Sequence, residues 1–172
     1  MNIPIAEIIN FHKQRTLCHV MTMNYFAQLL GYHFPEHDSD KNTEPYLTGY
    51  AYYNYVKHHP GSVMLPQQQE IFNKVHDEHH KMQPHHVEHY NSMKEIPDIF
   101  LIEMVCDWHS ANFEQNIITC ENEFASVSDF FNKSLSKLDW STKQKNTIKN
   151  LIDKISKLAD YSEVRKIWTC IN

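Results

Sequence analysis

The chain has 172 residues, 41% of them hydrophobic and 22% charged, which is typical of a globular domain and not of a disordered segment. Its net charge of −5, with histidine neutral, gives no indication of a nucleic-acid or membrane surface. Because no apolar run approaches the roughly 20 residues of a membrane span, no signal-peptide pattern is present and the four cysteines form no CxxC pair, we expect a soluble, cytoplasmic protein.

The first predicted helix covers about residues 5–30, and Gly31 is its expected stop. His12 and His19 lie on its apolar stripe, so both are expected to face the interior. A histidine on an apolar face is more often a hydrogen-bonded core residue than a metal ligand, and this alternative stays open for His19. The stripe consists of Ile5, Ile8, Ile9, His12, Thr16, His19, Met23, Phe26, Ala27 and Leu30.

A turn containing Pro35 then presents the adjacent pair His37 and Asp38. Neighbouring side chains on a helix diverge by about 100°, so both can bind one metal only from a helix end or a distorted turn. Alternatively, the Asp38 carboxylate bridges two metals while His37 binds one of them. The simpler interpretation is two exposed polar residues in a turn.

The middle of the chain predicts helices over residues 46–57 and 67–81, and six of the 13 histidines lie between positions 76 and 89. His79 shares a helix face with Phe72 and Val75, so it is the preferred ligand of the pair that it forms with His80. A solvated polar face, or a patch that binds metal adventitiously, would give the same pattern.

Pro84 interrupts this helix, so the orientation of His85 and His86 is open. The next helix is predicted over residues 99–113, and Asp107 lies beside its apolar stripe. A carboxylate in such surroundings needs a partner, either a metal or a buried salt bridge. The stripe consists of Ile99, Ile102, Cys106, His109 and Phe113.

The last fifty or so residues are richer in Lys, Ser and Asn and contain no histidine. We therefore predict an all-α, single-domain bundle in which residues 1–125 carry the site and residues 126–172 form a helical extension packed on them. That extension is expected to have no chemistry of its own. Its clearest amphipathic helix is marked by Ile148, Leu151, Ile152, Ile155 and Leu158.

Imidazole and carboxylate groups are ligands of first-row transition metals. The order His19, His37-Asp38, paired histidines, Asp107 resembles that of the HD-domain metal-dependent phosphohydrolase superfamily, whose fold is all-helical. The chain is also similar, over about residues 12–112, to a family of uncharacterised bacterial and viral proteins known as a domain of unknown function. The motifs TLxH, HDxSK, HH(K)…HHxEY and EMxCD stand here as Thr16-Leu17-Cys18-His19, His37-Asp38-Ser39-Asp40-Lys41, His79-His80-Lys81, His85-His86-Val87-Glu88 and Glu103-Met104-Val105-Cys106-Asp107.

The chain departs from this pattern at two places. Lys41 stands where HD-type nucleotidases often have Glu, which leaves the general acid open. The segment 81–84 is about one residue short, which leaves the pairing of the following histidines open. We take His86 as the ligand and keep His85, like His80, as a less certain one. The carboxy-terminal third lies outside the resemblance.

The resemblance implies one or two divalent transition-metal ions (Fe, Mn, Co, Ni or Zn). The ligands of a single ion would be His19, His37, Asp38 and Asp107. With two ions, Asp38 would bridge them, and His79 and His86 would complete the second site.

The function implied is hydrolysis of a small phosphate ester such as a nucleotide. Lys41 and Lys81 would neutralise the phosphate, and Glu103 would orient a ligand histidine or move a proton. Two alternatives stay open: an HD-type di-iron oxygenase, and a non-catalytic, metal-stabilised ligand-binding protein. The sequence does not specify the oligomeric state.

Overall fold

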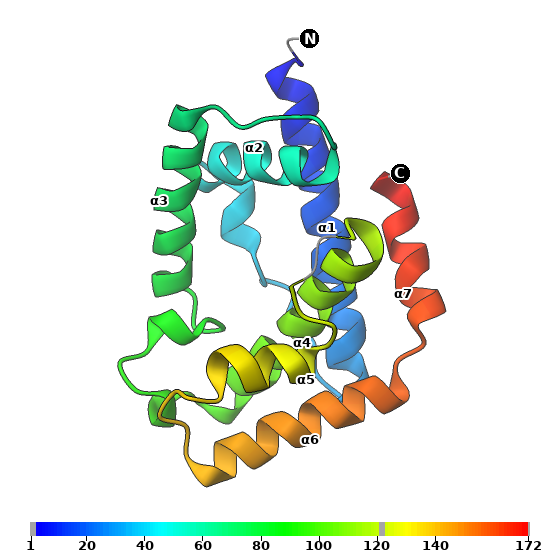
Figure 1. Cartoon of the computed structure of the whole chain (residues 1–172). Coiled ribbons are helices and arrows are strands. Elements are labelled where there is room, and N and C mark those ends of the chain that lie inside the picture. The colour runs from blue at the N-terminus through cyan, green and yellow to red at the C-terminus, as the bar shows by residue number, and fades with distance from the viewer. Residues whose placement is uncertain (1–2, 121–122, 172) are drawn as a thin grey trace.

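The computed structural model describes residues 3–120 and 123–171, and within these ranges it is built from helices without a strand (Figure 1). The predicted all-α class is therefore confirmed for the described residues. None of the helices there has both the length and the hydropathy to span a bilayer. The α-helices are α1 (Ile5–Leu29), α2 (Tyr46–His58), α3 (Pro66–Met82), α4 (Asp98–Phe113), α5 (Val127–Phe130), α6 (Thr142–Leu158) and α7 (Tyr161–Ile167).

Short turns of other helix types connect or extend these helices. The 3₁₀ turns are η1 (Ser39–Asn42), η2 (Val87–His89), η3 (Met93–Glu95) and η6 (Trp168–Ile171). The π turns are η4 (Glu114–Ile118), which continues α4, and η5 (Phe131–Leu135), which continues α5.

The first helix ends as predicted. Gly31 has φ +86, in the left-handed region that favours glycine, and the amide of Tyr32 donates to the carbonyl of Ala27. This closing turn redirects the chain away from α1 and into the loop that carries His37 and Asp38.

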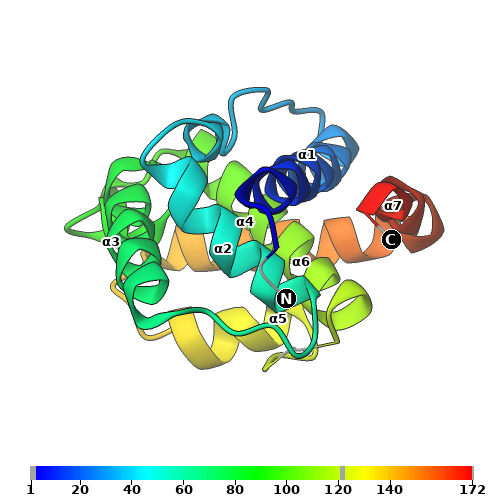
Figure 2. The same cartoon turned by 90° about the horizontal axis from the view of Figure 1, so that it is seen from above.

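The site-bearing helices form a connected series. Helix α2 packs against both α1 and α3, and α4 packs along α1. Figures 1 and 2 show α2 crossing between α1 and α3, and in Figure 1 the light-blue segment that contains η1 lies below α2, between those two helices. The loop after α1 therefore faces three helices at once.

The carboxy-terminal helices pack on this series from outside. Helix α6 contacts α4, and α7 flanks α1 on the side away from α3 (Figure 2). The largest hydrophobic cluster joins Phe26 and Leu101 to Ile148 and Trp168, and the Trp168 indole donates to Thr22 Oγ1 at 2.8 Å. Side chains from both sides of residue 125 thus share one core, while the boundary placed there stays a prediction.

Three residues of the predicted apolar stripes are exposed. Ile5, Ile99 and Leu158 each lie in the first or last turn of their helix, where neighbouring helices no longer cover the stripe. The 3.6-residue period correctly identified the buried face of these helices. It does not show how much of that face other helices cover near the helix ends.

Gly49 allows the close approach of α2 to α3. A Cβ atom built there would lie 2.5 Å from Val75 Cγ2, shorter than real contacts allow. We expect Gly49→Ala to lower the free energy of unfolding by about 1–3 kcal/mol, the usual cost of overpacking. Chemical denaturation measures this, with Asn10→Ala, at an exposed position of α1, as the control for an alanine substitution within a helix. A Gly49→Ala protein of unchanged stability would contradict the packing described.

Candidate metal centre

The loop after α1 is held in position by hydrogen bonds to Asn24, before the chain reaches His37 and Asp38. The buried Asn24 side chain accepts from the amide of Phe34 at 2.7 Å and donates to the carbonyl of the same residue at 3.0 Å. Asp38 then adopts the left-handed conformation, with φ 58 and ψ 15, which Asp tolerates better than most residues. The chain therefore has a distorted turn at this pair, one of the two conditions under which both residues could bind one metal, and His37 and Asp38 are both buried.

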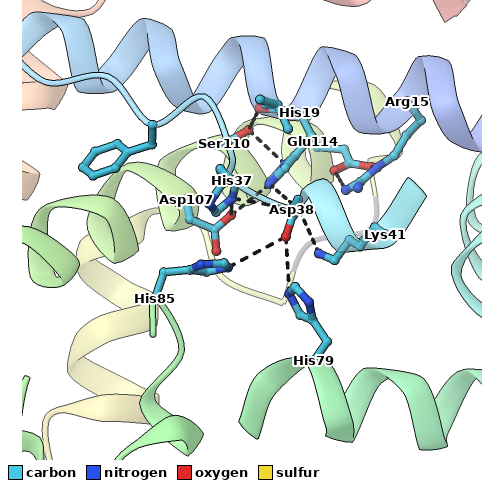
Figure 3. Close-up of polar contacts among 12 residues, drawn as sticks. Arg15, His19, His37, Asp38, Lys41, His79, His85, Asp107, Ser110 and Glu114 are labelled. Atoms are coloured by element: carbon cyan, nitrogen blue, oxygen red, sulfur yellow. Dashed lines mark hydrogen bonds and ion pairs between the residues drawn. The ribbon is translucent and has the colours of Figure 1, made fainter. Parts of the chain in front are cut away.

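The Asp38 carboxylate lies at the centre of the histidines (Figure 3). Its Oδ2 atom lies 3.6 Å from His19 Nε2 and 3.9 Å from His37 Nε2. Its Oδ1 atom lies 3.3 Å from His79 Nε2 and 3.8 Å from His85 Nε2. The two oxygens thus face two different pairs of imidazoles, an arrangement that would allow the carboxylate to bridge two ions.

Asp107, on α4, lies next to the first of these pairs, His19 and His37. Its Oδ1 atom lies 2.9 Å from His19 Nε2 and 3.5 Å from His37 Nε2. The four residues predicted to bind a single metal, including Asp38, therefore converge from α1, the following loop and α4, although they are widely separated in sequence.

Each of three histidines makes a contact through Nδ1. His37 Nδ1 donates to Glu103 Oε1 at 2.9 Å, and His79 Nδ1 donates to Asp40 Oδ2 at 2.8 Å. His19 Nδ1 lies 3.0 Å from the Oγ of Ser110, whose hydroxyl donates to the His19 carbonyl. A proton on Nδ1 leaves the Nε2 lone pair directed at the centre, as in metal sites whose ligands are oriented by a second layer of residues.

Several buried polar atoms of the centre have no hydrogen-bond partner among the residues that the structure describes. They include His37 Nε2, Asp38 Oδ1 and His85 Nε2. An unsatisfied buried polar atom costs about 1–3 kcal/mol. Because imidazole nitrogens and carboxylate oxygens are metal donors, a bound cation would satisfy all three atoms, and the residues present fit such an ion. Groups drawn from these residues can therefore hold a metal.

The protonation of the centre follows from its charges. Burial opposes the charged form of His37, but the carboxylates of Asp38 and Asp107 outweigh it and raise the pKa of His37 to about 10. Burial likewise opposes the charged form of Asp38, but Lys41 and His37 hold the pKa of Asp38 well below its usual value. Burial lowers the pKa of His85 to about 3, so this imidazole is neutral at pH 7.

His85 and His86, the two histidines after Pro84, contact different residues of the centre. His85, the less certain choice from sequence, faces Asp38, whereas the Nε2 of His86 lies 3.0 Å from His79 Nε2. The three rings are close enough to share one ion, so both histidines stay candidates. His80 lies farther out, with its Nδ1 3.4 Å from the Oε2 of Glu88.

The two lysines predicted to face phosphate also differ in their surroundings. Lys41 Nζ lies 2.8 Å from Asp38 Oδ2 and 4.8 Å from the centre of the Tyr50 ring. Lys81 is exposed on α3, and its backbone carbonyl accepts a hydrogen bond from His89 Nδ1. The structure therefore brings Lys41 to the centre and not Lys81.

His12, which the sequence placed on the buried stripe without a role, holds the Lys41 segment. Its Nε2 atom lies 2.9 Å from the carbonyl of Lys41, which only accepts, so Nε2 carries the proton. Burial lowers the pKa of His12 to about 4, so the ring is neutral and Nδ1 accepts from Asn54 Nδ2 at 2.8 Å. His12 thus ties η1 to α1 and α2.

The hydrogen bond from His12 to the Lys41 carbonyl can be tested by replacing His12 with each of the two amide residues. His12→Gln can place a donor near the position of Nε2, whereas the shorter His12→Asn cannot reach the Lys41 carbonyl. We expect His12→Asn to be less stable than His12→Gln by about 1–3 kcal/mol, the cost of leaving a buried partner unsatisfied. Urea denaturation compares the stabilities of the two variants. Equal stabilities would count against the hydrogen bond from His12 to the Lys41 carbonyl.

A second buried network lies one turn from the centre and was not predicted. Arg15 on α1 donates two hydrogen bonds to Glu114 on η4, and His58 Nε2 lies 2.8 Å from Glu114 Oε1. Despite burial, Arg15 holds the pKa of Glu114 well below its usual value. Arg15 precedes His19 by four residues, so this ion pair fixes α1 against the helix that carries Asp107. The sequence signal was only a charged residue on each helix.

The chain belongs to the family of unknown function DUF5662, whose family model matches residues 8–157. This match extends well past residue 112, so the family pattern includes much of the carboxy-terminal third, which we had expected to lie outside it. No curated protein and no solved structure matches the chain.

Proposed function

We propose that this member of the DUF5662 family is an HD-type, metal-dependent phosphohydrolase that acts on a small phosphate ester, with nucleotides as one class to test. The observation that carries the proposal is the position of Asp38. Its carboxylate lies between two groups of imidazoles, and one of its oxygens is 2.8 Å from the ammonium group of Lys41. The residues that would bind metal therefore lie next to a lysine ammonium group that could bind a phosphate.

Two divalent ions are proposed, one on each side of Asp38. His19, His37 and Asp107 would hold the first with Asp38 Oδ2. The second would be held by Asp38 Oδ1 and His79, with His85 or His86 completing it. The nitrogen-rich donor set suits Fe, Mn, Co, Ni or Zn better than Mg or Ca.

Such ions, when bound, would lower the pKa of a coordinated water and polarise a phosphoryl oxygen. The residues of the chain supply the remaining functions. Lys41 carries a positive charge at the edge of the centre, where it would neutralise a phosphate oxygen. Its contact with Asp38 would give way when cations neutralise that carboxylate, which frees the ammonium group for substrate.

Glu103 is proposed to orient His37 and to move protons. Its Oε1 atom lies 2.9 Å from His37 Nδ1 and 3.6 Å from His85 Nδ1, so one carboxylate contacts a histidine of each group. Glu103 also lines a cavity of about 270 Å³ together with these two histidines. The Glu103 carboxylate could therefore accept a proton from these histidines, and the cavity beside it could carry that proton onward.

Metal binding should release a proton. Because the pKa of His37 is raised to about 10, its imidazole is protonated at pH 7 in the metal-free protein and must lose that proton to bind a metal. Affinity should therefore rise with pH, by about tenfold per unit, until the pH passes that pKa. Calorimetry in two buffers with different ionisation enthalpies counts the protons. Binding that releases none at pH 7 would contradict the protonation described.

The proposed activity is tested with metal-free protein reloaded with Mn²⁺, Co²⁺, Ni²⁺ or Zn²⁺. p-Nitrophenyl phosphate and a series of nucleoside and sugar monophosphates serve as substrates. Phosphate release that depends on the ion, and is lost with a chelator, is expected. A protein that binds its ions but turns over none of these esters would count against hydrolysis and favour a non-catalytic, ligand-binding role.

Oxygen activation by two irons is the second candidate. The observation that favours it is the group His79, His85 and His86, whose three imidazoles suit iron well. Lys41 at Asp38 favours phosphate chemistry instead. Iron that changes redox state and consumes oxygen, with no ester hydrolysis under any metal, would reverse the preference.

A further inference from the structure

A row of side chains leads outward from Asp38. His79 Nε2 lies 3.3 Å from Asp38 Oδ1 and 3.0 Å from His86 Nε2. The ring of His86 stacks on that of His80, with centroids 3.9 Å apart and planes at 12°. His80 Nδ1 in turn lies 3.4 Å from Glu88 Oε2. Donor groups are thus in contact from the centre to the outer end of the row.

Exposure increases along this row. The side chain of His79 is 0% exposed, that of His80 is 24% exposed and that of Glu88 is 50% exposed. Asp77 adds a carboxylate near the outer end, since its Oδ1 atom lies 3.6 Å from His76 Nδ1 and the His76 ring lies 4.0 Å from that of His80; such negative charge favours the approach of cations. An ion from solvent therefore meets His80 and Glu88 before it meets His79.

We propose that His80, His86 and Glu88 form an outer metal site, which takes up a divalent transition-metal ion from solvent and delivers it to the buried centre. The three residues offer donor atoms that all lie within 4.8 Å of one another. Two imidazoles and one carboxylate suit Zn²⁺, Co²⁺ or Mn²⁺. For the outer ion to bind, the two stacked rings turn so that their nitrogens converge.

His86 is the residue that links the outer site to the buried one. It belongs both to the outer group and to the inner group with His79 and His85. A rotation of this ring exchanges one set of neighbours for the other, so an ion can pass inward without losing all its protein ligands. The inference rests on the buried centre of the proposed function, but it does not depend on the hydrolytic step.

The test follows Co²⁺ uptake by metal-free, full-length protein, using the visible absorption of cobalt in stopped flow and the final metal content by elemental analysis. The variant is His80→Ala/Glu88→Gln, which removes two outer donors and keeps His86. His89→Ala is the matched control, because it removes a histidine from the same segment that is not part of the outer group. We expect the control to load like the wild type.

The outer-site variant should load its buried centre roughly tenfold or more slowly, by analogy with the loss of metal affinity when supporting contacts at a metal site are removed. At saturation it should bind one ion fewer than the wild type, with the buried ions retained. A variant with the same rate and the same ion count as the wild type would overturn the outer site. A wild type that takes up no cobalt would instead overturn the buried centre itself, so the two failures are distinguishable.

Discussion

Replacing Asp38 by alanine is expected to empty the centre of metal and to lower any phosphatase rate by at least 10²–10³-fold, the loss seen for a single charge-stabilising group. The reason is that the two oxygens of the Asp38 carboxylate face both groups of histidines. Its removal takes a ligand from each proposed ion at once. Elemental analysis and ester hydrolysis measure the two losses.

The fold should survive this substitution. Asp38 lies in a loop outside the hydrophobic clusters, Lys41 is partly exposed and can turn to solvent, and His37 can give up its proton. Circular dichroism should therefore show unchanged helix content. Asp153→Ala, which removes an exposed acid from α6, serves as the control for charge alone. Full metal occupancy in Asp38→Ala would mean that Asp38 is not a ligand and that the site as described is wrong.

Replacing Lys41 by methionine should separate metal binding from turnover. In the metal-free protein the Lys41 ammonium group contacts Asp38 Oδ2, the oxygen proposed to hold the first ion. Removing this competing cation should leave metal affinity unchanged or increase it. The rate of ester hydrolysis should nevertheless fall by about 10²–10³-fold, because a positive charge next to the phosphate is lost.

Lys81→Met is the matched comparison, since the sequence assigned phosphate binding to both lysines. Its side chain is exposed on α3, and we expect nearly wild-type kinetics. Metal titration and steady-state kinetics of both variants decide between them. Loss of metal in Lys41→Met, or equal losses of rate in the two variants, would contradict the role given to Lys41.

The helices could be predicted from sequence because their apolar periods are strong and Gly31 marks the end of the first one. Burial at helix ends could not be predicted in this way: Ile99 belongs to the apolar stripe of α4 but is exposed. The packing of the carboxy-terminal helices into the shared core depends on long-range contacts such as that of Trp168 with Thr22. No local pattern specifies such a contact.

The inner residues of the candidate site lie close together in the structure, as the family-like order of metal donors in the sequence led us to expect. Their supporting residues were not predicted. The contacts of Ser110 with His19, and of Asp40 with His79, join residues that are distant in sequence and common on any surface. The orientation of His85 after Pro84 was also beyond local reasoning, since a proline removes the helical phase that distinguished His79 from His80.

The central claim is that Asp38 bridges two metal ions, and anomalous diffraction from crystals grown with Mn²⁺ or Co²⁺ tests it most directly. We expect two anomalous peaks on opposite sides of the Asp38 carboxylate, one beside His19 and Asp107 and one beside His79 and His85. A fully loaded crystal with no peak next to Asp38 would contradict the account.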